Sequence, residues 1–586
     1  MMSPARTVER LRTFGRAALT VLAALLPFEQ LEPLARIGPL QLSSVELFLY
    51  LALATWGLAV VASWWAGERD DLVERIERAP FAHHAVAAFG LVVLVSAAVA
   101  PAARGTALKF ALRSVGGMLL YAAAADLLRA PGTSVRVAKA LVGGALVAAL
   151  LAITEARSVA VRALLHSFHL VTFEALGRPR ASGPFQYPNI AAMYLEAVAP
   201  IVAALGAGLF VVRRSRLQLL GFMLVLLLLL DGVLATASRA GLVGGLAAIA
   251  ALAVLYGRRG ENRALAPALL ATLLALGALA SGSELVGRFR FWKDGAWYRA
   301  VVTPSSGELG RLPAVLAPGS TVAQTLEIQN QGALAWLRVP PRPVALSYHW
   351  LDADTGAMVV RDGVRTIFPR DLYPGASAQV RAQVRAPSRP GRYVLWWDLV
   401  QEHTTWFSER GDPGLRQSVV VDRRGVVAGV VGSDGFPQVP IIVQPGAPDE
   451  SSRGTLWRAA FSAWRAHPLL GLGPDNFRHL SGKFHAFEHP DERMHANSLY
   501  FETLADLGLV GLLVFGAVVA ALAGAARRAI AEPASRILAL GVAAGLATYL
   551  FHGLLDYFLE FTPTYALFWL LAGMMVAMDR SPETAA

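Results

Sequence analysis

The feature that most constrains this chain is a series of apolar stretches near the length of about 20 residues that an α-helix needs to cross a bilayer. They recur towards both ends of the 586 residues, so a single membrane anchor does not account for them. The sequence therefore predicts a polytopic membrane protein. We expect spans near residues 13–28, 41–66, 80–100, 108–128, 135–155, 190–212, 217–236, 239–256, 265–282, 505–526, 537–557 and 563–579.

The composition agrees with a membrane location. Only 16% of the residues are charged, against about a quarter in soluble proteins. Cysteine is absent, which excludes disulfides, thiolate metal sites and cysteine nucleophiles. The net charge of +11 comes mostly from short arginine clusters between apolar stretches. That distribution is typical of topology signals, so we expect membrane lipid around the chain and no nucleic acid partner.

The loops between spans predict the orientation. Positive residues accumulate on the cytoplasmic side, and arginines cluster in one alternating set of loops. We therefore expect a bacterial inner (cytoplasmic) membrane protein with an even span count and both termini in the cytoplasm. Residues 157–189 and 283–504 then lie on the outer, periplasmic side. The arginines of the inner set include Arg69, Arg75, Arg78, Arg213, Arg214, Arg216, Arg258, Arg259, Arg263, Arg527, Arg528 and Arg536.

The long outer segment contains a predicted β-domain. Short alternating segments, separated by turn signals such as Pro374-Gly375, predict an antiparallel, immunoglobulin-like all-β sandwich over 315–422. We expect strands at Thr321–Ile328, Val344–Trp350, Ala357–Val360, Ala378–Val384, Tyr393–Val400 and Ser418–Val421. The fold class is thus membrane all-α, with about 12 helices and this sandwich inserted between spans 9 and 10. The predicted divisions are 1–282, 283–314, 315–422, 423–504 and 505–586.

Tryptophans in and around this domain have two interpretations. Trp350, Trp396, Trp397 and Trp406 either stack on sugar rings or form the sandwich core, and we expect the core because aromatic residues usually serve burial. Outside the domain, Thr455–Ala466 has aromatic residues at helical spacing and predicts a helix lying in the membrane interface. Arg288–Arg299 has a similar pattern.

Several cations lie on the predicted outer side, where the topology rule expects few. Arginine binds phosphate oxygens through a rigid fork, so such a cluster suits a multiply charged anion such as a diphosphate. Lys109 and Arg113, four residues apart, share a helix face. The alternative is scattered side chains that contact lipid headgroups. The cluster contains Arg104, Lys109, Arg113, Arg178, Arg180 and Arg239.

Four ionisable residues fall inside predicted spans, namely Glu196, Asp231, His552 and Asp556. Charged groups at that depth are costly and usually face a polar cavity. His552 and Asp556 are again four residues apart. They form either an acid–base pair or a structural pair between helices, and we expect the structural pair.

Three further segments carry a resemblance to a known family. The first is 180–189 (RASGPFQYPN), the second is 237–241 (ASRAG), and the third runs from 467–477 (HPLLGLGPDNF) to 495–508 (HANSLYFETLADLG). In this order, with a long outer loop before the last spans, they resemble the O-antigen ligase and polymerase superfamily. The resemblance covers about 170–282 and 453–580.

The resemblance implies a membrane glycosyltransferase of the GT-C type that needs neither a metal nor another cofactor. Such enzymes move a glycan from undecaprenyl pyrophosphate to lipid A core, to another repeat unit or to a protein. Arg180 and Arg239 would hold the pyrophosphate, and His495 would be the base. Gly183 would shape the loop, and Gly471 and Gly473 would shape the turn beneath the site. The substrate-binding set would comprise Arg178, Asn189, Lys109, Arg113, Glu196, Asp231 and Arg453.

The chain departs from the family pattern at the histidine. The family usually has His directly before Asn, whereas this chain has His495-Ala-Asn497-Ser498. The nearby His479, His485 and His489 therefore remain open as alternatives. Asp231 or Glu196 would either orient the base or replace it.

Three hypotheses follow for the function. The first is glycan transfer, with ligase-type activity slightly preferred over polymerase or protein-glycosylating activity because the Trp-rich outer loop suits a large acceptor. The second is a transporter of lipid-linked glycan, which predicts inverted repeats that we do not find. The third is a glycan-binding receptor, which leaves the outer arginines unexplained.

Overall fold

The computed structural model describes residues 4–37, 40–66, 81–169, 173–175, 178–213, 215–258, 265–281, 298–332, 335–338, 343–402, 405–425, 453–484 and 495–579. The chain divides into two compact units. The membrane unit comprises Met1–Phe173, Pro179–Glu284 and Ser451–Ala586. The β unit comprises Glu174–Arg178 and Leu285–Glu450.

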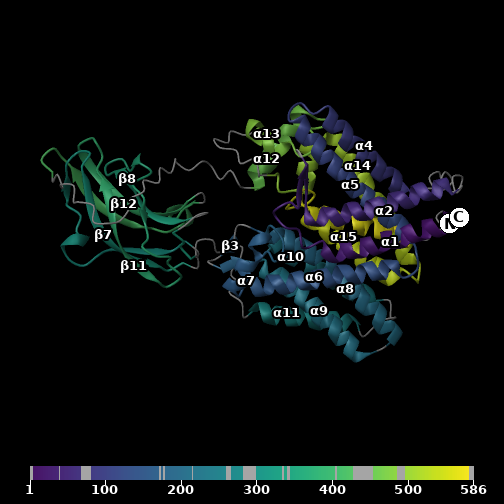
Figure 1. Ribbon diagram of the computed structural model, residues 1–586. Coiled ribbons are helices and arrows are strands. Elements are labelled where there is room, and N and C mark those ends of the chain that lie inside the picture. Colours follow the sequence, from purple (N-terminus) through teal and green to yellow (C-terminus); the bar gives the residue numbers. More distant parts are fainter. Residues whose placement is uncertain are drawn as a thin grey trace. The chain divides into compact units, whose positions relative to one another are not determined.

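The membrane unit is helical, because a helix satisfies all of its backbone polar groups inside lipid. Each predicted span coincides with a helix (Figure 1). These helices are α1 (Pro4–Leu25), α2 (Ser44–Trp65), α4 (Phe81–Ala98), α5 (Arg104–Leu127), α6 (Thr133–Glu155), α8 (Pro188–Arg213), α9 (Arg216–Ala235), α10 (Arg239–Arg258), α11 (Leu265–Ser281), α14 (Leu499–Ala531), α15 (Arg536–His552) and α16 (Thr562–Met578).

Eight of the described helices are long and apolar enough to cross a membrane, namely α2, α4, α5, α6, α8, α9, α10 and α14. Shorter apolar helices lie within α11, α15 and α16. The chain is therefore a multi-pass membrane protein, and the count of about 12 spans stays a prediction. The span within α8, Pro188–Gly208, is buried throughout, and α8 packs against α15, α9 and α10.

Short elements connect these helices. α7 (Val159–Leu164) and the 3-10 turn η1 (Leu165–Ser167) follow α6. Two-stranded sheets are formed by β1 (Ala35–Ile37) with β2 (Leu40–Leu42) and by β3 (Phe173–Ala175) with β4 (Arg178–Arg180). α12 (Arg453–Ala466) confirms the predicted Trp-rich helix, and α13 (Phe477–Phe484) follows it. The similar pattern at Arg288–Arg299 falls largely outside the described residues.

A kink at Gly508 shapes the start of α14. Gly508 has φ of +67°, a left-handed conformation that favours glycine. A Cβ atom there would lie 2.3 Å from the carbonyl oxygen of Leu469. The kink therefore lets the 469–473 turn approach the helix backbone, and this turn carries part of the site described below.

The β unit contains two sheets, which makes it a sandwich over residues 300–421. One sheet has the order β10-β8-β12-β14-β6, with β9 on β8 and β13 on β12, and the other has the order β11-β7-β5. Every predicted strand is present, and β5 begins at Ala300, before the predicted border at 315. The strands are β5 (Ala300–Pro304), β6 (Val315–Leu316), β7 (Thr321–Asn330), β8 (Val344–Asp352), β9 (Met358–Val360), β10 (Thr366–Ile367), β11 (Ser377–Arg385), β12 (Gly391–Gln401), β13 (Thr405–Trp406) and β14 (Leu415–Val421), with the 3-10 turns η4 (Glu308–Gly310) and η5 (Ser408–Arg410).

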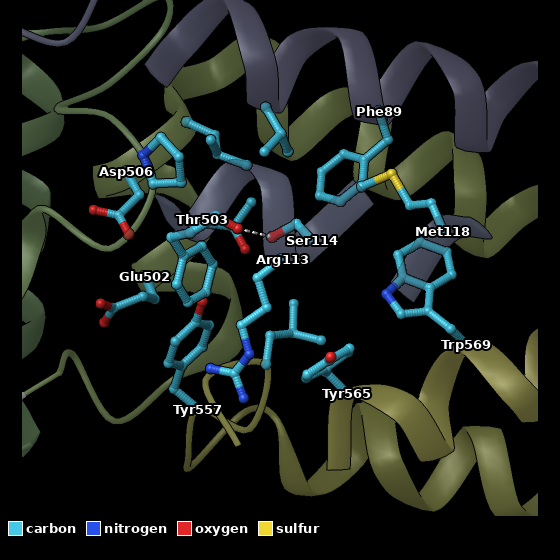
Figure 2. Close-up of a pocket in the computed structure, with 15 residues that line it drawn as sticks. Phe89, Arg113, Ser114, Met118, Glu502, Thr503, Asp506, Tyr557, Tyr565 and Trp569 are labelled. Atoms are coloured by element: carbon cyan, nitrogen blue, oxygen red, sulfur yellow. Dashed lines mark hydrogen bonds between the residues drawn. The ribbon is translucent and has the colours of Figure 1, made fainter. Parts of the chain in front are cut away.

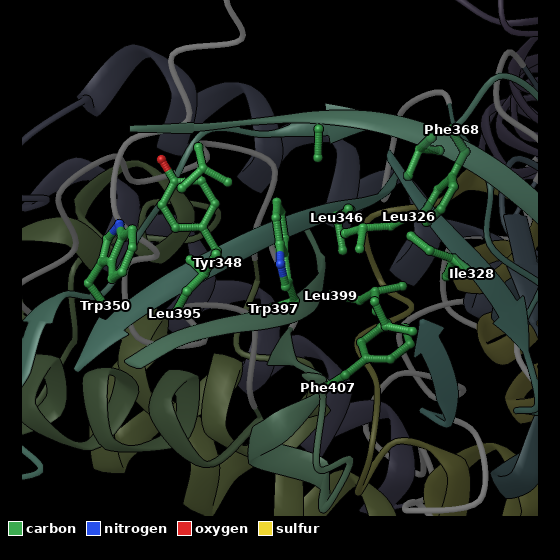
Figure 3. Packing of buried hydrophobic residues seen from close by; sticks show 14 of the residues in the cluster. Leu326, Ile328, Leu346, Tyr348, Trp350, Phe368, Leu395, Trp397, Leu399 and Phe407 are labelled. Atoms are coloured by element: carbon green, nitrogen blue, oxygen red, sulfur yellow. The ribbon is translucent and has the colours of Figure 1, made fainter. Parts of the chain in front are cut away.

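The core of the β unit fills the space between the sheets. β7 and β11 alternate buried and more exposed residues along most of their length, as expected for strands with one core face. Trp350 and Trp397 are fully buried in this core, which confirms packing as their role (Figure 3). Trp396 and Trp406 are only half-buried and contact His349 on β8 instead, at ring-centroid distances of 5.2 and 4.3 Å.

Candidate active site

The loop before α8 positions Arg180. Its guanidinium donates from Nε to the carbonyl of Thr236 (2.9 Å) and from Nη2 to Oδ1 of Asn189 (2.7 Å). The Thr236 carbonyl belongs to the turn between α9 and α10, and α10 begins three residues later at Arg239. Arg180 therefore bonds to the turn from which Arg239 follows, although 59 residues separate the two arginines in sequence.

Backbone hydrogen bonds also hold this loop against the end of α6. Gly183 has φ of +56°, and its N–H and that of Ser182 donate to Oε2 of Glu155 (2.6 and 2.9 Å). The N–H of Ala181 donates to the carbonyl of Ala235 (3.1 Å). The expected shaping role of Gly183 agrees with this geometry, because only a residue tolerant of positive φ turns the chain there without strain.

Asn189 links Arg180 to a second segment. Its Nδ2 donates to Oδ2 of Asp556 (2.8 Å), and the Nε of Arg453 donates to the neighbouring carbonyl of Leu555 (3.0 Å). Burial raises the pKa of Asp556, while the hydrogen bonds from Asn189 and from the N–H of Tyr557 oppose that rise. Four segments that are distant in sequence thus converge here: residues 180–189, the turn at Thr236, Arg453, and residues 555–557.

The segment after Asp556 reaches His495. The ring of Tyr557 lies 5.0 Å from the imidazole. The Nδ1 of His495 lies 2.7 Å from Oε1 of Glu502, and its Nε2 lies 2.7 Å from Oε2 of Glu560. Glu502 also accepts the N–H of Ala496 (2.5 Å). Burial disfavours the imidazolium, but the carboxylates of Glu502 and Glu560 outweigh burial and hold the pKa of His495 well above its usual range.

A third acidic residue faces this histidine. Arg478 lies 2.7 Å from Asp475 and 3.7 Å from Glu560. The ligand atoms of Asp475, His495 and Glu560 lie within 4.8 Å of one another, a spacing that metal ligands also have. However, Arg478 already contacts both carboxylates, and both imidazole nitrogens already face carboxylates. The residues present therefore fit an ion-pair network better than a cation site.

The turn before α13 holds Asp475 in place. Asp506 accepts the N–H groups of Asp475 (2.7 Å) and Phe477 (2.8 Å). Gly471 and Gly473 have φ of +67° and +97°, and a Cβ atom on Gly471 would lie 2.4 Å from the backbone of Asp506. These glycines therefore allow the close approach expected of the turn beneath the site.

A cavity that is partly open to solvent adjoins the network. Figure 2 shows Glu502, Asp506 and Tyr557 at one end and Phe89, Met118 and Trp569 at the other. Its cation is Arg113, which donates from Nη2 to Oγ1 of Thr562 (2.7 Å) and lies 4.8 Å from the centre of the Tyr565 ring. The cavity thus combines an apolar end with a charged end.

Some predicted residues lie apart from this network. Glu196 is buried and bonds to Nδ1 of His552 (2.7 Å), and Asp231 lies 4.0 Å from Arg157. Lys109 is exposed one turn before Arg113 on α5. The structure does not describe the side chain of Arg178, and His485 and His489 fall outside the described residues. His479 lies on α13.

The predicted pairing of His552 with Asp556 is wrong. Helix α15 ends at His552, so Asp556 lies in the following turn and not one helical turn further along the same face. His552 pairs with Glu196, and Asp556 pairs with Asn189. The sequence interpretation also missed Glu502 and Glu560 as partners of His495. Glu502 was part of the family-like segment, whereas no local pattern marks Glu560.

Comparison with known proteins now defines the class. Residues 419–516 match the family model described as O-antigen ligase. This match confirms the predicted resemblance of this multi-pass membrane protein to the O-antigen ligase and polymerase superfamily. It supports, in broad terms, a ligase- or polymerase-type function on a lipid-linked glycan and a glycan acceptor at the bacterial inner membrane.

Other comparisons add little. No curated protein matches the chain. Among solved structures, the chain is similar to Pseudomonas fluorescens alkylpurine DNA glycosylase AlkC bound to DNA containing an abasic site analog. The identity is 11%, over 59% of this chain and 98% of that chain, with a TM-score of 0.14. A score that low carries no argument about fold or function.

Proposed function

We propose that the protein transfers a glycan from undecaprenyl pyrophosphate to a glycan or glycolipid acceptor on the outer face of the inner membrane, in the manner of an O-antigen ligase. The observation that carries the proposal is a series of contacts that begins at Arg180. Hydrogen bonds join Arg180 to Asn189 and Asn189 to Asp556. Tyr557, the next residue, then contacts the imidazole of His495 with its ring. Under this proposal, Arg180 would bind the diphosphate at one end of this series of contacts, and the cluster around His495 would transfer the proton at the other end.

The chemistry divides between the two ends of this series of contacts. A glycosyl diphosphate is already activated, so the barrier falls when positive charge stabilises the departing diphosphate. Arg180 and Arg239 would supply that charge, since guanidinium stays protonated and binds phosphate oxygens in pairs. The cluster around His495 would receive the proton of the attacking hydroxyl.

The cavity beside Arg113 suits the lipid part of such a donor. Its apolar end is lined by Phe89, Met118 and Trp569, and its charged end lies next to Glu502. The apolar end would take isoprenoid units of the donor, while the diphosphate would be bound by Arg180 and Arg239. GT-C type chemistry that needs no metal, and an outer-face orientation with both termini inside, are parts of this proposal.

A gel profile of surface and carrier-linked glycans tests the proposal. It compares the source strain, a deletion strain, and the deletion carrying Arg180→Ala or Arg180→Lys. We expect Arg180→Ala to lower transfer by about 10²- to 10³-fold, the usual effect of removing one donor that stabilises transition-state charge. Arg180→Lys keeps the charge but loses the fork, so its activity falls between those of the wild type and the alanine variant.

The pattern of products identifies the reaction. Polymer that accumulates on the lipid carrier while the acceptor stays bare indicates a ligase. Loss of long chains while single repeat units are still transferred indicates a polymerase. A deletion strain with both pools unchanged would contradict glycan transfer altogether.

A further inference from the structure

We infer that Glu560 removes the proton from the acceptor hydroxyl, while His495 is a positively charged positioning residue oriented by Glu502. The inference rests on the proposed glycan transfer and assigns one step within it. It makes Glu560 the catalytic base of the reaction, in place of the histidine that the family resemblance suggested.

The first argument comes from the two nitrogens of the imidazole. Each lies 2.7 Å from a carboxylate oxygen, one of Glu502 and one of Glu560. A nitrogen lone pair and a carboxylate oxygen would repel each other at that distance, so each nitrogen must carry a hydrogen. The contact at Nε2 is an ion pair rather than an aligned hydrogen bond, and the same repulsion argument applies to it. An imidazolium has no lone pair with which to accept a proton.

The second argument is access. The side chain of Glu560 is 24% exposed, whereas those of His495 and Glu502 are 8% and 1% exposed. An acceptor sugar that approaches the cluster therefore meets the carboxylate of Glu560 first. It reaches Nε2 of His495 only after displacing that carboxylate.

The neighbouring carboxylates are less suitable as the base. Both oxygens of Asp556 already accept hydrogen bonds, from Asn189 and from the N–H of Tyr557. Asp506 is buried and holds two backbone N–H groups of the turn before α13. Glu560 instead lies in the turn between α15 and α16, at the edge of the cluster.

The hydroxyl proton of the acceptor passes to the carboxylate of Glu560 as its oxygen forms a bond to the anomeric carbon. The bond from that carbon to the diphosphate oxygen breaks, and undecaprenyl pyrophosphate leaves with the electron pair. Glu560 then returns the proton to water. His495 keeps both hydrogens throughout and holds the carboxylate towards the acceptor.

Surrounding charges decide when Glu560 is ionised. Burial raises its pKa, but the positive charge of the neighbouring His495 and the guanidinium of Arg478, with a contribution from Arg113, outweigh burial and hold the pKa below its usual range. Glu560 is therefore a carboxylate at neutral pH. The titratable and charged groups that face the Glu560–His495 pair are Arg113, Asp475, Arg478, Glu502, Asp506, Asp556 and Tyr557.

The pH dependence of transfer separates the two candidate bases. A base works in its deprotonated form, so activity rises with pH through the pKa of the base. If Glu560 is the base, it is fully deprotonated once the pH exceeds the ordinary pKa range of glutamate. Transfer activity then stays flat between about pH 6 and 8. If His495 is the base, its raised pKa makes activity climb throughout that interval. A climbing profile in the wild type would overturn the inference.

The experiment uses membranes that contain the full-length protein, with lipid-linked glycan and acceptor extracted from the deletion strain. We expect Glu560→Gln to lower transfer at least about 100-fold, because removing a general base typically costs 10²- to 10⁴-fold. We expect His495→Gln, which keeps a hydrogen-bond donor, to lose about tenfold and to retain the flat profile. The reverse order of effects would assign the proton to His495.

Controls exclude misfolding and failure of the overall reaction. Glu560→Asp, with a shorter carboxylate, is expected to recover part of the activity that Glu560→Gln loses, at equal protein level and equal elution in detergent. Chelator that abolishes wild-type transfer, with recovery on adding Mg²⁺, would overturn the assignment in favour of a cation at this cluster. Absence of transfer by the wild type overturns the proposed function itself, whereas equal transfer by the wild type and Glu560→Gln overturns only the inference.

Discussion

Each unit of this protein buries a histidine against a carboxylate, and the two surroundings differ. In the β unit, Nε2 of His349 lies 3.2 Å from Asp398, Nδ1 contacts the carbonyl of Arg361, and Trp406 covers the ring. Asp398 also accepts the N–H groups of Leu399 and Ser408. This network is closed, because each of these atoms has a partner within the unit.

The histidine of the membrane unit belongs to an open network. His495 lies between two carboxylates, one of which is partly exposed. Among the described residues around it, Oδ1 of Asp475 and Nε of Arg478 are buried without a hydrogen-bond partner. Unsatisfied buried groups cost stability, and their presence is typical of a site that receives a ligand. A buried histidine–carboxylate pair alone therefore does not mark an active site. Partial exposure of one partner, together with nearby buried polar atoms that lack hydrogen-bond partners, is the better mark.

The largest expected effect concerns the aromatic core of the β unit. Trp397→Ala removes a fully buried indole whose Nε1 bonds to Gln324 and Gln417, so we expect a loss of about 3–5 kcal/mol of stability. Limited proteolysis of the full-length protein during heating measures the loss. Trp396→Ala is the matched control on the neighbouring residue, and it should cost about 1 kcal/mol through its stacking with Arg416. Comparable losses in both variants would contradict the assignment of Trp397 to the core.

A pair of isosteric changes tests the comparison directly. Asp398→Asn leaves the His349 ring without its charged partner, and we expect a cost of about 1–3 kcal/mol in the stability of the β unit with transfer unchanged. Glu502→Gln in the membrane unit should instead lower transfer with little change in thermal stability. Glycan transfer and thermal unfolding are measured on both variants, to separate a loss of activity from a loss of stability. The comparison fails if the two changes have the same signature.

A smaller effect is expected at the link between Arg180 and Asp556. Asn189→Ala removes both hydrogen bonds of the bridging amide, so Arg180 loses the partner of its Nη2. We expect transfer to fall about tenfold, which corresponds to about 1.4 kcal/mol in the barrier. Initial rates at saturating acceptor measure it. Unchanged rates would remove Asn189 from the positioning of Arg180.

The smallest effect is expected at Lys109. Its ammonium is exposed, so water and salt screen it, and Lys109→Ala should change transfer less than about threefold. Arg113→Ala, one turn further along α5, is the contrast because Arg113 lines the cavity. Rates at two salt concentrations distinguish a screened surface charge from a binding charge. A larger loss for Lys109→Ala than for Arg113→Ala would contradict the assignment of Lys109 to the solvent-screened surface.

The sequence by itself determined the secondary structure and one half of the site. Apolar length and the alternation of strand residues are local properties, so a helix lies at every predicted span and every predicted strand is present. Eight of the described helices are long and apolar enough to cross a membrane. Arg180 and Asn189 lie nine residues apart in one segment, so the family-like motif identified both, and it also contained His495. The tryptophan core followed from the tendency of aromatic residues to be buried.

Only the tertiary structure decided which charges meet. Glu196 pairs with His552, Asp556 with Asn189, and Glu560 with His495, and two of these three pairs join residues more than 300 positions apart. No periodicity encodes such pairs, because they depend on how α8, α14 and α15 pack and on where α15 ends. The identity of the base therefore could not be read from the chain. A carboxylate and a neutral imidazole can each accept a proton, and the choice between them depends on burial and on the groups that packing brings to each one.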